Sequence, residues 1–328
     1  MSFNWNAPSN DNRKRIAGYE PSSYIEKADI AIGDLQTNGG YLAPAQAREF
    51  ISLMIKESVL LQRIFVKTMR GPTEELNQVK FGSRILHAGT SGSALSAGNR
   101  SAPDTSDVTL TAQLFKAEVH LNDEVVEDNI EQGRFVETVV REAVRRVALD
   151  VEEILVNGDT ASGDPDLAVL DGLIKQATSN IVNFTGRSFL KDDMSEMWKD
   201  MPSRYKRMKR EMVYLTGHDA EQDYRNSLSD RATGIGDRYL IEDQTATYSG
   251  IPVMAVPVWP EDLGTNNDQT VALLTAWKNI VYGIWRKIKI ERDREISEGL
   301  WKIVITIRWD VKYQEEDAVV KGINIATT

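Results

Sequence analysis

The sequence predicts an α+β fold built on one long strand, one long helix and a hairpin. Residues 301–313 alternate apolar and polar side chains with only Val304 out of place, a half-buried strand well above the usual length of about 5 to 6 residues. Residues 66–120 contain strand-like runs on either side of a stretch rich in Gly and Ser at 87–107, which predicts a long two-stranded hairpin. A continuous apolar stripe at helical spacing predicts a helix at 134–157, and it consists of Val136, Val140, Ala143, Val144, Val147, Val151, Ile154 and Leu155.

The composition suits a soluble protein of 328 residues and removes several kinds of chemistry. Apolar residues make up 41% of the chain and charged residues 27%, enough for a core and a soluble surface. We expect no membrane span and no secretory signal, because the chain has no long apolar run and its N-terminus is polar. The absence of cysteine excludes disulfides, thiolate metal sites and cysteine nucleophiles, and it fits a reducing cytosol.

The net charge of −10 argues against general binding of nucleic acid, which requires clustered Lys and Arg to neutralise phosphates. Two local basic runs are present, Arg13-Lys14-Arg15 and the cations within 204–210. We interpret both as solvated faces or protein contacts.

The first 40 residues and the hairpin both require a partner. Residues 1–40 are polar with scattered anchors, so we expect an arm that becomes ordered on another molecule. A turn at 38–44 then leads into a predicted helix at 45–58. In the hairpin the alternation changes phase between Leu114 and Phe115, which predicts a bulge or a strong twist. An isolated hairpin is marginally stable in water, so one of this length is expected to rest on a neighbour.

No motif in the sequence predicts an active site. The glycine-rich stretch lacks the lysine and the strand-to-helix setting of a phosphate-binding loop, and no Gly-x-Ser-x-Gly is present. The histidines are far apart in sequence, and His218 is expected to open a helix whose N-terminus favours Asp219. Glu152 and Glu153 are adjacent on the predicted helix and cannot face one another, and the acidic groups at 192–193 and 315–317 are interpreted as solvated carboxylates at element ends. We therefore predict a protein that is not an enzyme and has no cofactor and no metal.

Six stretches, taken in order, carry a resemblance to a known family. They are NGGYLAPAQAREFISLMIKESVLLQR, SAPDTSDVTLTAQLFKAEVHLNDEVVEDN, REAVRRVALDVEEILVNGD followed by DGLIKQA, SGIPVMAVPVWP, VALLTAWKNIVYGIWRKIKIERDRE and DAVVKGINI. Together they cover about residues 38–325, and their order and spacing make the match specific. They resemble the first domain helix, the extended loop, the spine helix, the axial strands and the closing strand of the major capsid protein of tailed bacteriophages, which has the Hong Kong 97-like fold.

The resemblance implies a division of the chain into an arm, a peripheral domain, an extended loop and an axial domain. The expected boundaries are an N-terminal arm at 1–40, the first part of the peripheral domain at 41–65, the extended β-hairpin loop at 66–120, the peripheral domain with its long spine helix at 121–165, the axial domain at 166–295, and the long peripheral strands and C-terminus at 296–328. The resemblance further implies assembly in the bacterial host cytoplasm, as hexamers and pentamers, into an icosahedral virion shell around double-stranded DNA.

We expect contacts between subunits at three places. At the tip of the extended loop the expected contact residues are His87, Ser93, Leu95, Asn99 and Arg100. In the N-terminal arm they are Trp5, Arg13, Lys14, Arg15, Tyr19 and Tyr24. In the axial domain they are Arg204, Lys206 and Arg207.

The expected partners follow from the same resemblance. They are further copies of the chain, a portal protein, a separate scaffolding protein and, as an optional addition, a decoration protein. A separate scaffolding protein is expected because the family pattern begins near residue 38 and not after a long scaffolding segment. DNA would be enclosed without sequence-specific binding, and no membrane is involved.

Two other functions remain open at this point. An encapsulin-like nanocompartment that holds enzyme cargo would use the same fold, although the polar arm of about 40 residues favours the phage. A hydrolase or nucleotide-binding enzyme is a more distant alternative, which the lack of catalytic motifs disfavours.

Overall fold

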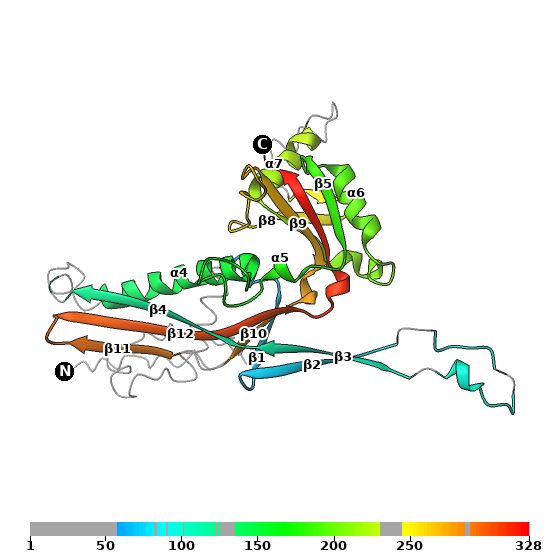
Figure 1. Cartoon of the computed structure of the whole chain (residues 1–328), viewed down its shortest axis with the longest axis horizontal. Helices are drawn as coiled ribbons and strands as arrows, with labels where there is room; N and C mark the ends of the chain where they lie inside the picture. The colour runs from blue at the N-terminus through cyan, green and yellow to red at the C-terminus, as the bar shows by residue number, and fades with distance from the viewer. Residues whose placement is uncertain are drawn as a thin grey trace, which may run out of the picture. The chain divides into compact units, whose positions relative to one another are not determined.

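The computed structural model describes residues 58–81, 84–89, 91–100, 102–122, 124, 135–229, 245–285 and 289–327. All of them belong to the compact unit that spans Gly40–Thr328. Two β-sheets and a separate two-stranded hairpin organise this part of the chain (Figure 1). Among the described residues, no helix has both the length and the apolar character needed to cross a membrane. The predicted arm at 1–40 and the predicted helix at 45–58 lie outside the described residues, apart from Ser58.

The five-stranded sheet is built around one long strand, β12 (Leu300–Tyr313). One edge of β12 pairs antiparallel with β11 (Lys289–Glu295) and β10 (Ile280–Trp285), and the other edge pairs antiparallel with β4 (Gln113–Asn122). The fifth strand, β1 (Phe65–Met69), pairs parallel with β10. The predicted apolar face of β12 is confirmed, because six of its side chains are at most 4% exposed: Ile303, Ile305, Ile307, Trp309, Val311 and Tyr313.

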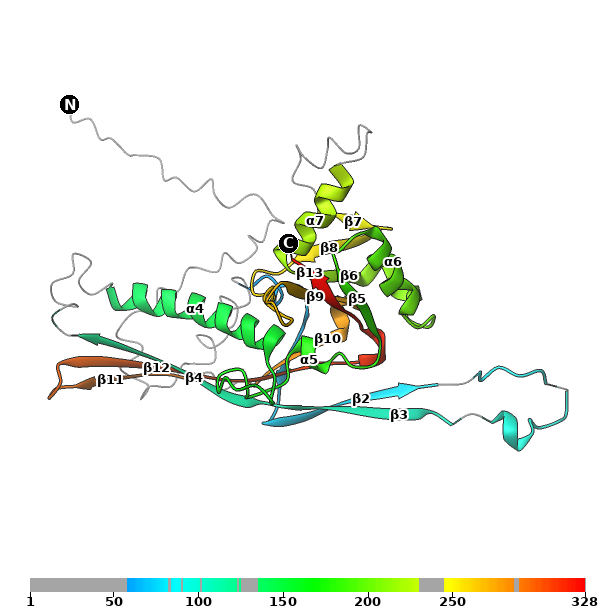
Figure 2. The same cartoon turned by 45° about the horizontal axis from the view of Figure 1, so that its top comes forward.

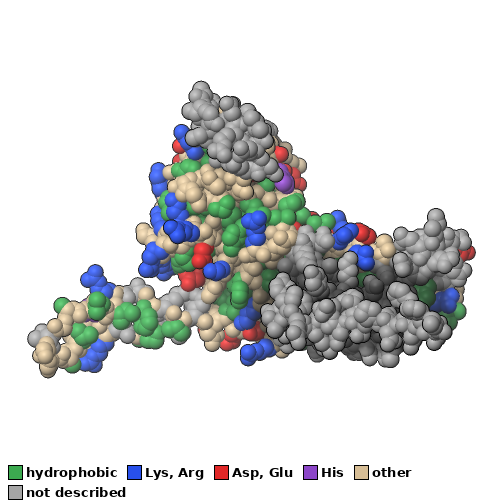
Figure 3. Space-filling view, turned by 180° about the vertical axis from the view of Figure 1, so that it is seen from behind, with side chains coloured by type: hydrophobic (Ala, Val, Ile, Leu, Met, Phe, Trp, Pro, Cys, Tyr) green, Lys and Arg blue, Asp and Glu red, His purple; other side chains and the backbone are tan. Residues whose placement is uncertain are grey.

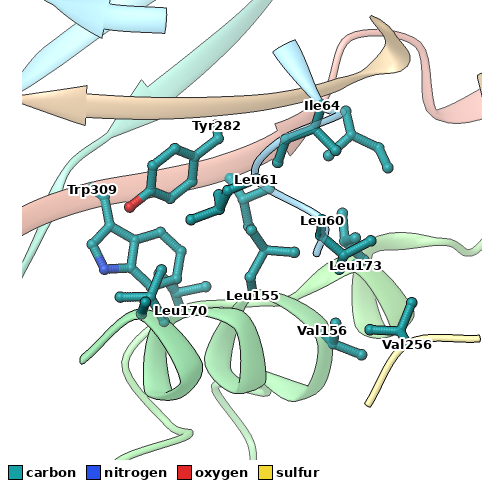
Figure 4. Packing of buried hydrophobic residues seen from close by; sticks show 14 of the residues in the cluster. Leu60, Leu61, Ile64, Leu155, Val156, Leu170, Leu173, Val256, Tyr282 and Trp309 are labelled. Atoms are coloured by element: carbon teal, nitrogen blue, oxygen red, sulfur yellow. The ribbon is translucent and has the colours of Figure 1, made fainter. Parts of the chain in front are cut away.

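Helix α4 (Phe135–Asn157) covers one face of this sheet (Figures 1 and 2). Its side chains at Val144, Val151 and Leu155 are buried in one apolar cluster with β12. Figure 4 shows Leu155 beside the rings of Trp309 and Tyr282. The predicted apolar stripe is therefore confirmed from Val140 onward. Helix α4 has 23 residues and is about 35 Å long.

Gly158 follows α4 and does not end it in the left-handed conformation, because its φ is not positive. A Cβ at Gly158 would lie 2.5 Å from the carbonyl oxygen of Leu170. The N–H of Gly172 donates to the carbonyl of Gly158 at 2.8 Å, and a Cβ at Gly172 would also collide with backbone. The two glycines thus permit a close backbone approach that places the short helix α5 (Leu173–Gln176) beside the end of α4.

The six-stranded sheet carries helices on one face and joins the main core through the other. Its strand order is β5 (Ile181–Arg187), β13 (Val320–Ala326), β9 (Gln269–Ala276), β6 (Met212–Thr216), β8 (Ile251–Ala255) and β7 (Thr247–Tyr248). Helices α6 (Lys191–Asp200) and α7 (His218–Ser229) bury Met194 and Tyr224 against one face. Val213 and Leu273 on the other face belong to the cluster that contains α4 and β12. His218 opens α7, as predicted.

Three short segments connect the two sheets and are bonded to one another. They are residues 177–180, the 3-10 turn η4 (Trp277–Asn279) and residues 314–319 with the turn η5 (Glu316–Ala318). The side chain of Asn279 donates to the carbonyl of Glu315 and accepts from its N–H, at 2.8 and 2.7 Å. The carboxylate of Glu316 accepts from the N–H groups of Thr178 and Ser179, at 2.6 and 2.7 Å. These bonds satisfy backbone groups that neither sheet pairs.

The two sheets take strands from both sides of the expected domain boundaries, which stay a prediction. The expected axial segment 166–295 includes β10 and β11, which pair with β12 in the five-stranded sheet. The expected peripheral segment 296–328 includes β13, which pairs with β5 and β9 in the six-stranded sheet. Alternation along a strand identifies its apolar face but not its partner, and these partners are far apart in sequence.

The hairpin consists of β2 (Thr73–Lys80) and β3 (Asp104–Thr111), paired antiparallel over their full length. Figures 1 and 2 show it extending away from the five-stranded sheet. It covers a narrower range than the expected 66–120, because β1 and β4 at the ends of that range pair in the five-stranded sheet. The buried face changes between Ala112 and Gln113, two residues before the predicted place. At this point β3, which pairs with β2, ends, and β4, which pairs with β12, begins.

Candidate assembly surfaces

The far part of the hairpin exposes several apolar side chains in the single chain. Their exposed fractions lie between 37% and 87%, and the residues are Val79, Phe81, Ile85, Leu86 and Leu95. Figure 3 shows hydrophobic side chains along this part of the hairpin. Single exposed apolar residues are ordinary, but a group of them on one slender projection is typical of a surface that binds another molecule.

The tip of the hairpin has a defined local structure. Its last turn is the 3-10 element η1 (Ala97–Asn99), and the Nε–H of Arg100 donates to the carbonyl of Leu95 across it, at 3.2 Å. Three of the predicted tip residues, Leu95, Asn99 and Arg100, therefore meet around η1. The other two lie elsewhere on the tip: Ser93 is exposed, and His87 Nε2 lies 3.1 Å from the carbonyl oxygen of Arg84.

The base of the hairpin has a small apolar cluster of its own. Met69, Leu110 and Val281 are at most 1% exposed and form this cluster. A Cβ at Gly283 would lie 2.9 Å from Leu110 Cδ1 and 3.0 Å from Met69 Sδ. Glycine at this position therefore lets both side chains pack directly on β10. This packing joins β1, β3 and β10 where the hairpin leaves the sheet.

Asp310 holds the last residue of the hairpin. Its Oδ2 accepts a hydrogen bond from the N–H of Thr111 at 2.8 Å, and its Oδ1 accepts from the N–H of Val311 at 2.8 Å. The residue is 4% exposed, and burial raises the pKa of the Asp310 carboxyl although both donors favour its charged form. The alternating pattern had placed Asp310 on the polar face of β12, so its burial corrects that prediction. The signal for it was an aspartate inside a long strand, where this residue type is depleted.

Asp193 and Glu316, which the sequence had indicated as solvated, are structural instead, and so is Glu152. Glu152 is 1% exposed, and its Oε1 accepts from the N–H of Leu60 at 2.7 Å, so it fixes the turn after residue 57 against α4. Burial raises the pKa of Glu152. Asp193 is 3% exposed and accepts from the N–H of Leu190 at the start of α6, and Glu316 joins two of the connecting segments. Within the described ranges, no group of acidic or histidine side chains could hold a metal ion.

The predicted axial residues lie together between α6 and β6, on and beside the 3-10 turn η3 (Lys206–Glu211). Arg207 is exposed, while Arg204 pairs with Asp317 at 2.5 Å. The Nζ of Lys206 lies 5.8 Å from the centre of the Trp198 ring, a cation–π contact. Figure 3 shows Lys and Arg side chains gathered along this side of the six-stranded sheet. The predicted arm residues Trp5, Arg13, Lys14, Arg15, Tyr19 and Tyr24 lie outside the described part of the chain.

Comparison with known families identifies the class of protein that carries these surfaces. A family model described as the phage capsid family matches residues 39–323. The chain belongs to the phage capsid family. The putative prophage capsid protein YqbE of Bacillus subtilis (strain 168) is 34% identical to this capsid protein over 305 residues, which cover 92% of this chain and 97% of the relative.

Solved structures show the same fold at low sequence identity. A chain of the satellite phage P4 procapsid, which includes the size determination protein, matches with a TM-score of 0.65 and 13% identity, over 88% of this chain and 94% of that one. A chain of the holo-SrpI encapsulin complex from Synechococcus elongatus PCC 7942 matches with a TM-score of 0.60 and 12% identity, over 91% and 96% of the two chains. A capsid chain of a native GTA particle matches with a TM-score of 0.59 and 11% identity, over 82% and 91%.

These findings confirm the predicted family and the predicted fold class. The capsid protein is an α+β protein of the Hong Kong 97-like kind, and its family makes it a structural component of a virion shell and not an enzyme. Membership of this family also supports self-association, since the related chains are parts of shells.

Proposed function

We propose that this chain is the major capsid protein of a tailed bacteriophage, assembling as hexamers and pentamers into an icosahedral head around double-stranded DNA. The observation that carries the proposal is the far part of the hairpin, whose apolar side chains are exposed in the single chain. Each fully buried Leu, Ile or Phe contributes on the order of 1.5–3 kcal/mol, so seating the hairpin on a neighbouring copy favours association. Repetition over many copies turns modest contacts into a stable shell.

The two sheets receive separate roles in this proposal. The five-stranded sheet with α4 forms the peripheral domain, the six-stranded sheet forms the axial domain near the capsomer centre, and residues 73–111 form the extended loop. The loop tip contacts a neighbour through His87, Ser93, Leu95, Asn99 and Arg100. The arm at 1–40 adds contacts through its aromatic residues Trp5, Tyr19 and Tyr24 and its basic run at 13–15.

The remaining partners follow from the shell itself. A portal protein occupies one vertex, a separate scaffolding protein directs assembly in the host cytoplasm, and a decoration protein is an optional addition. The DNA is enclosed without sequence-specific binding, and the net charge of −10 supports this, because a wall of this charge does not grip phosphates.

An encapsulin-like nanocompartment is the second candidate, and the similarity to the SrpI encapsulin favours it at the level of the fold. The relative at 34% identity is a prophage capsid protein, which gives the phage function more support.

The direct test is expression of the full chain, alone and together with candidate scaffolding proteins encoded beside it. We expect megadalton icosahedral shells in negative-stain micrographs when the scaffolding protein is present. A compact monomer or dimer under every condition would overturn the capsid function. Abundant shells of correct size from the chain alone would overturn only the separate scaffolding protein.

The hairpin is tested by deletion of residues 87–106. We expect soluble monomers or capsomers with an unchanged thermal unfolding transition, together with a loss of shells, because the two main apolar clusters do not include the deleted segment. An insoluble, unfolded product would contradict the assignment of this segment to assembly.

A further inference from the structure

The six-stranded sheet carries a strongly basic surface that its own chain leaves largely unneutralised. We define the basic flank as Lys199, Arg204, Lys206, Arg207, Lys209 and Arg210. Of these six residues, only Arg204 forms an ion pair with a carboxylate of the described chain, that of Asp317. Lys206 instead donates to the carbonyl of Lys199 at 3.1 Å, and Lys209 donates to the hydroxyl of Ser249 at 2.8 Å. The flank therefore retains most of its positive charge on a chain whose net charge is −10.

A second surface of the same sheet is acidic. We define the acidic flank as Asp219, Glu221, Asp223, Glu261 and Asp262. Glu221 pairs with Arg225 at 2.8 Å, whereas no ion pair within the described part of the chain neutralises the other four. Glu261 accepts from the N–H of Asp219 at 2.9 Å, which brings the start of α7 and the loop after β8 together.

The two flanks lie at opposite ends of the same pair of strands. Strands β6 and β8 run parallel. The turn η3 leads directly into β6, and Ser249, the partner of Lys209, precedes β8, so the basic flank lies at the first ends of both strands. Helix α7 and residues 261–262 follow β6 and β8, so the acidic flank lies at their last ends. Each strand has five residues, which separates the flanks by about 17 Å.

We propose that the basic flank of one copy binds the acidic flank of the next copy. Charge complementarity selects this occupant: the two surfaces have opposite signs, lie on opposite ends of one domain and cannot meet within one chain. A contact between two different surfaces of identical subunits is heterologous, and it closes into a ring when the rotation between subunits permits. Opposite charges fix the register and speed the encounter of the subunits. The inference rests on the proposed function and identifies the surfaces, and the physical force, that close the capsomer.

Charge reversal tests the pairing. The first variant replaces four cations of the basic flank by Glu, which takes its formal charge from +6 to −2: Lys206→Glu, Arg207→Glu, Lys209→Glu and Arg210→Glu. The second replaces three carboxylates of the acidic flank by Lys, which takes its formal charge from −5 to +1: Asp219→Lys, Asp223→Lys and Asp262→Lys. Each alone presents flanks of like sign, so we expect at least a tenfold lower yield of hexamers and pentamers by native mass spectrometry at low salt, with scaffolding protein present. Arg141→Glu with Arg146→Glu, on the exposed face of α4, lowers the net charge of the chain outside the flanks, as the first variant does within them, and is expected to assemble like the wild type.

Mixing provides the decisive result. In an equimolar mixture, a ring in which the two variants alternate pairs flanks of opposite charge at every contact. Strict alternation requires an even number of subunits, so a ring with an odd number must pair flanks of like charge at one contact or more. We therefore expect hexamers to return in the mixture without pentamers, and both ring sizes to return when the substitutions of both variants are combined in one chain. Folding of each variant is checked by its thermal unfolding transition.

The outcomes separate the inference from the function on which it rests. If the wild type forms shells and the folded reversal variants form rings equally well, the flank pairing is wrong and the capsid function stands. Failure of the mixture and of the combined variant to recover, with all chains folded, also overturns the pairing. Absence of shells from the wild type would overturn the capsid function itself.

Discussion

The apolar side chains of β12 are buried within the chain, whereas those of the outer hairpin face solvent. Ile305 on β12 is 1% exposed, and Leu86 beyond β2 is 87% exposed. β12 has strand partners on both edges and α4 over one face, while β2 and β3 pair only with each other. An apolar pattern therefore identifies a surface that is to be covered, and the cover can belong to the same chain or to another copy.

The largest expected effect is on the β12 side of this comparison. Trp309 is 0% exposed, and its ring lies 5.0 Å from that of Phe115 and 5.2 Å from that of Tyr282, between centroids. Trp309→Ala removes both contacts and leaves a cavity, so we expect the free energy of unfolding of the unassembled subunit to fall by about 3–5 kcal/mol. Urea titration monitored by circular dichroism measures the change. A loss below about 1 kcal/mol would mean that β12 is not the centre of the subunit core.

The sequence predicts the elements that depend on local patterns, but not the contacts between residues far apart in the chain. The alternation of β12 and the stripe of α4 identify both elements, because each depends on residues that are near in sequence. The roles of Asp310 and Glu152 escape prediction, since their partners Thr111 and Leu60 are 199 and 92 residues away. The tip residues and the basic flank are recognisable as exposed groups, but the partners we propose for them belong to another chain, and no pattern within one sequence describes that geometry.

The next effect concerns Asp310, which joins the two regions. Asp310→Ala leaves the N–H of Thr111 without its acceptor, so we expect a loss of about 1–3 kcal/mol in the free energy of unfolding of the subunit. Hydrogen exchange of the hairpin amides should increase, because the hairpin base opens more often. Unchanged exchange in β3 would show that the apolar cluster at the base suffices.

The pH dependence of stability gives an independent check on Asp310. Burial raises the pKa of its carboxyl in the folded state, so the folded subunit binds the proton more tightly than the unfolded chain does. This contribution to stability is complete below the ordinary pKa of aspartate and is lost as the pH rises through the raised value. Relative to Asp310→Asn, which does not titrate, the free energy of unfolding of the wild type should therefore decrease with rising pH. An increase would contradict the dominance of burial at this site.

The smallest effect on the subunit is expected on the hairpin side. Leu86 makes little contact within its own chain, so Leu86→Ser should change the free energy of unfolding by no more than about 0.5 kcal/mol. Shell formation should nevertheless fall, because each interface loses the burial of one leucine and the loss recurs at every copy. Ile181→Ser is the matched control: Ile181 is also exposed, at 47%, but lies on β5, away from the hairpin. Light scattering during assembly with scaffolding protein compares the two variants. Equal assembly by Leu86→Ser and Ile181→Ser would mean that the apolar hairpin is not the surface that a neighbouring copy covers, and the contrast with β12 would then lose its explanation in assembly.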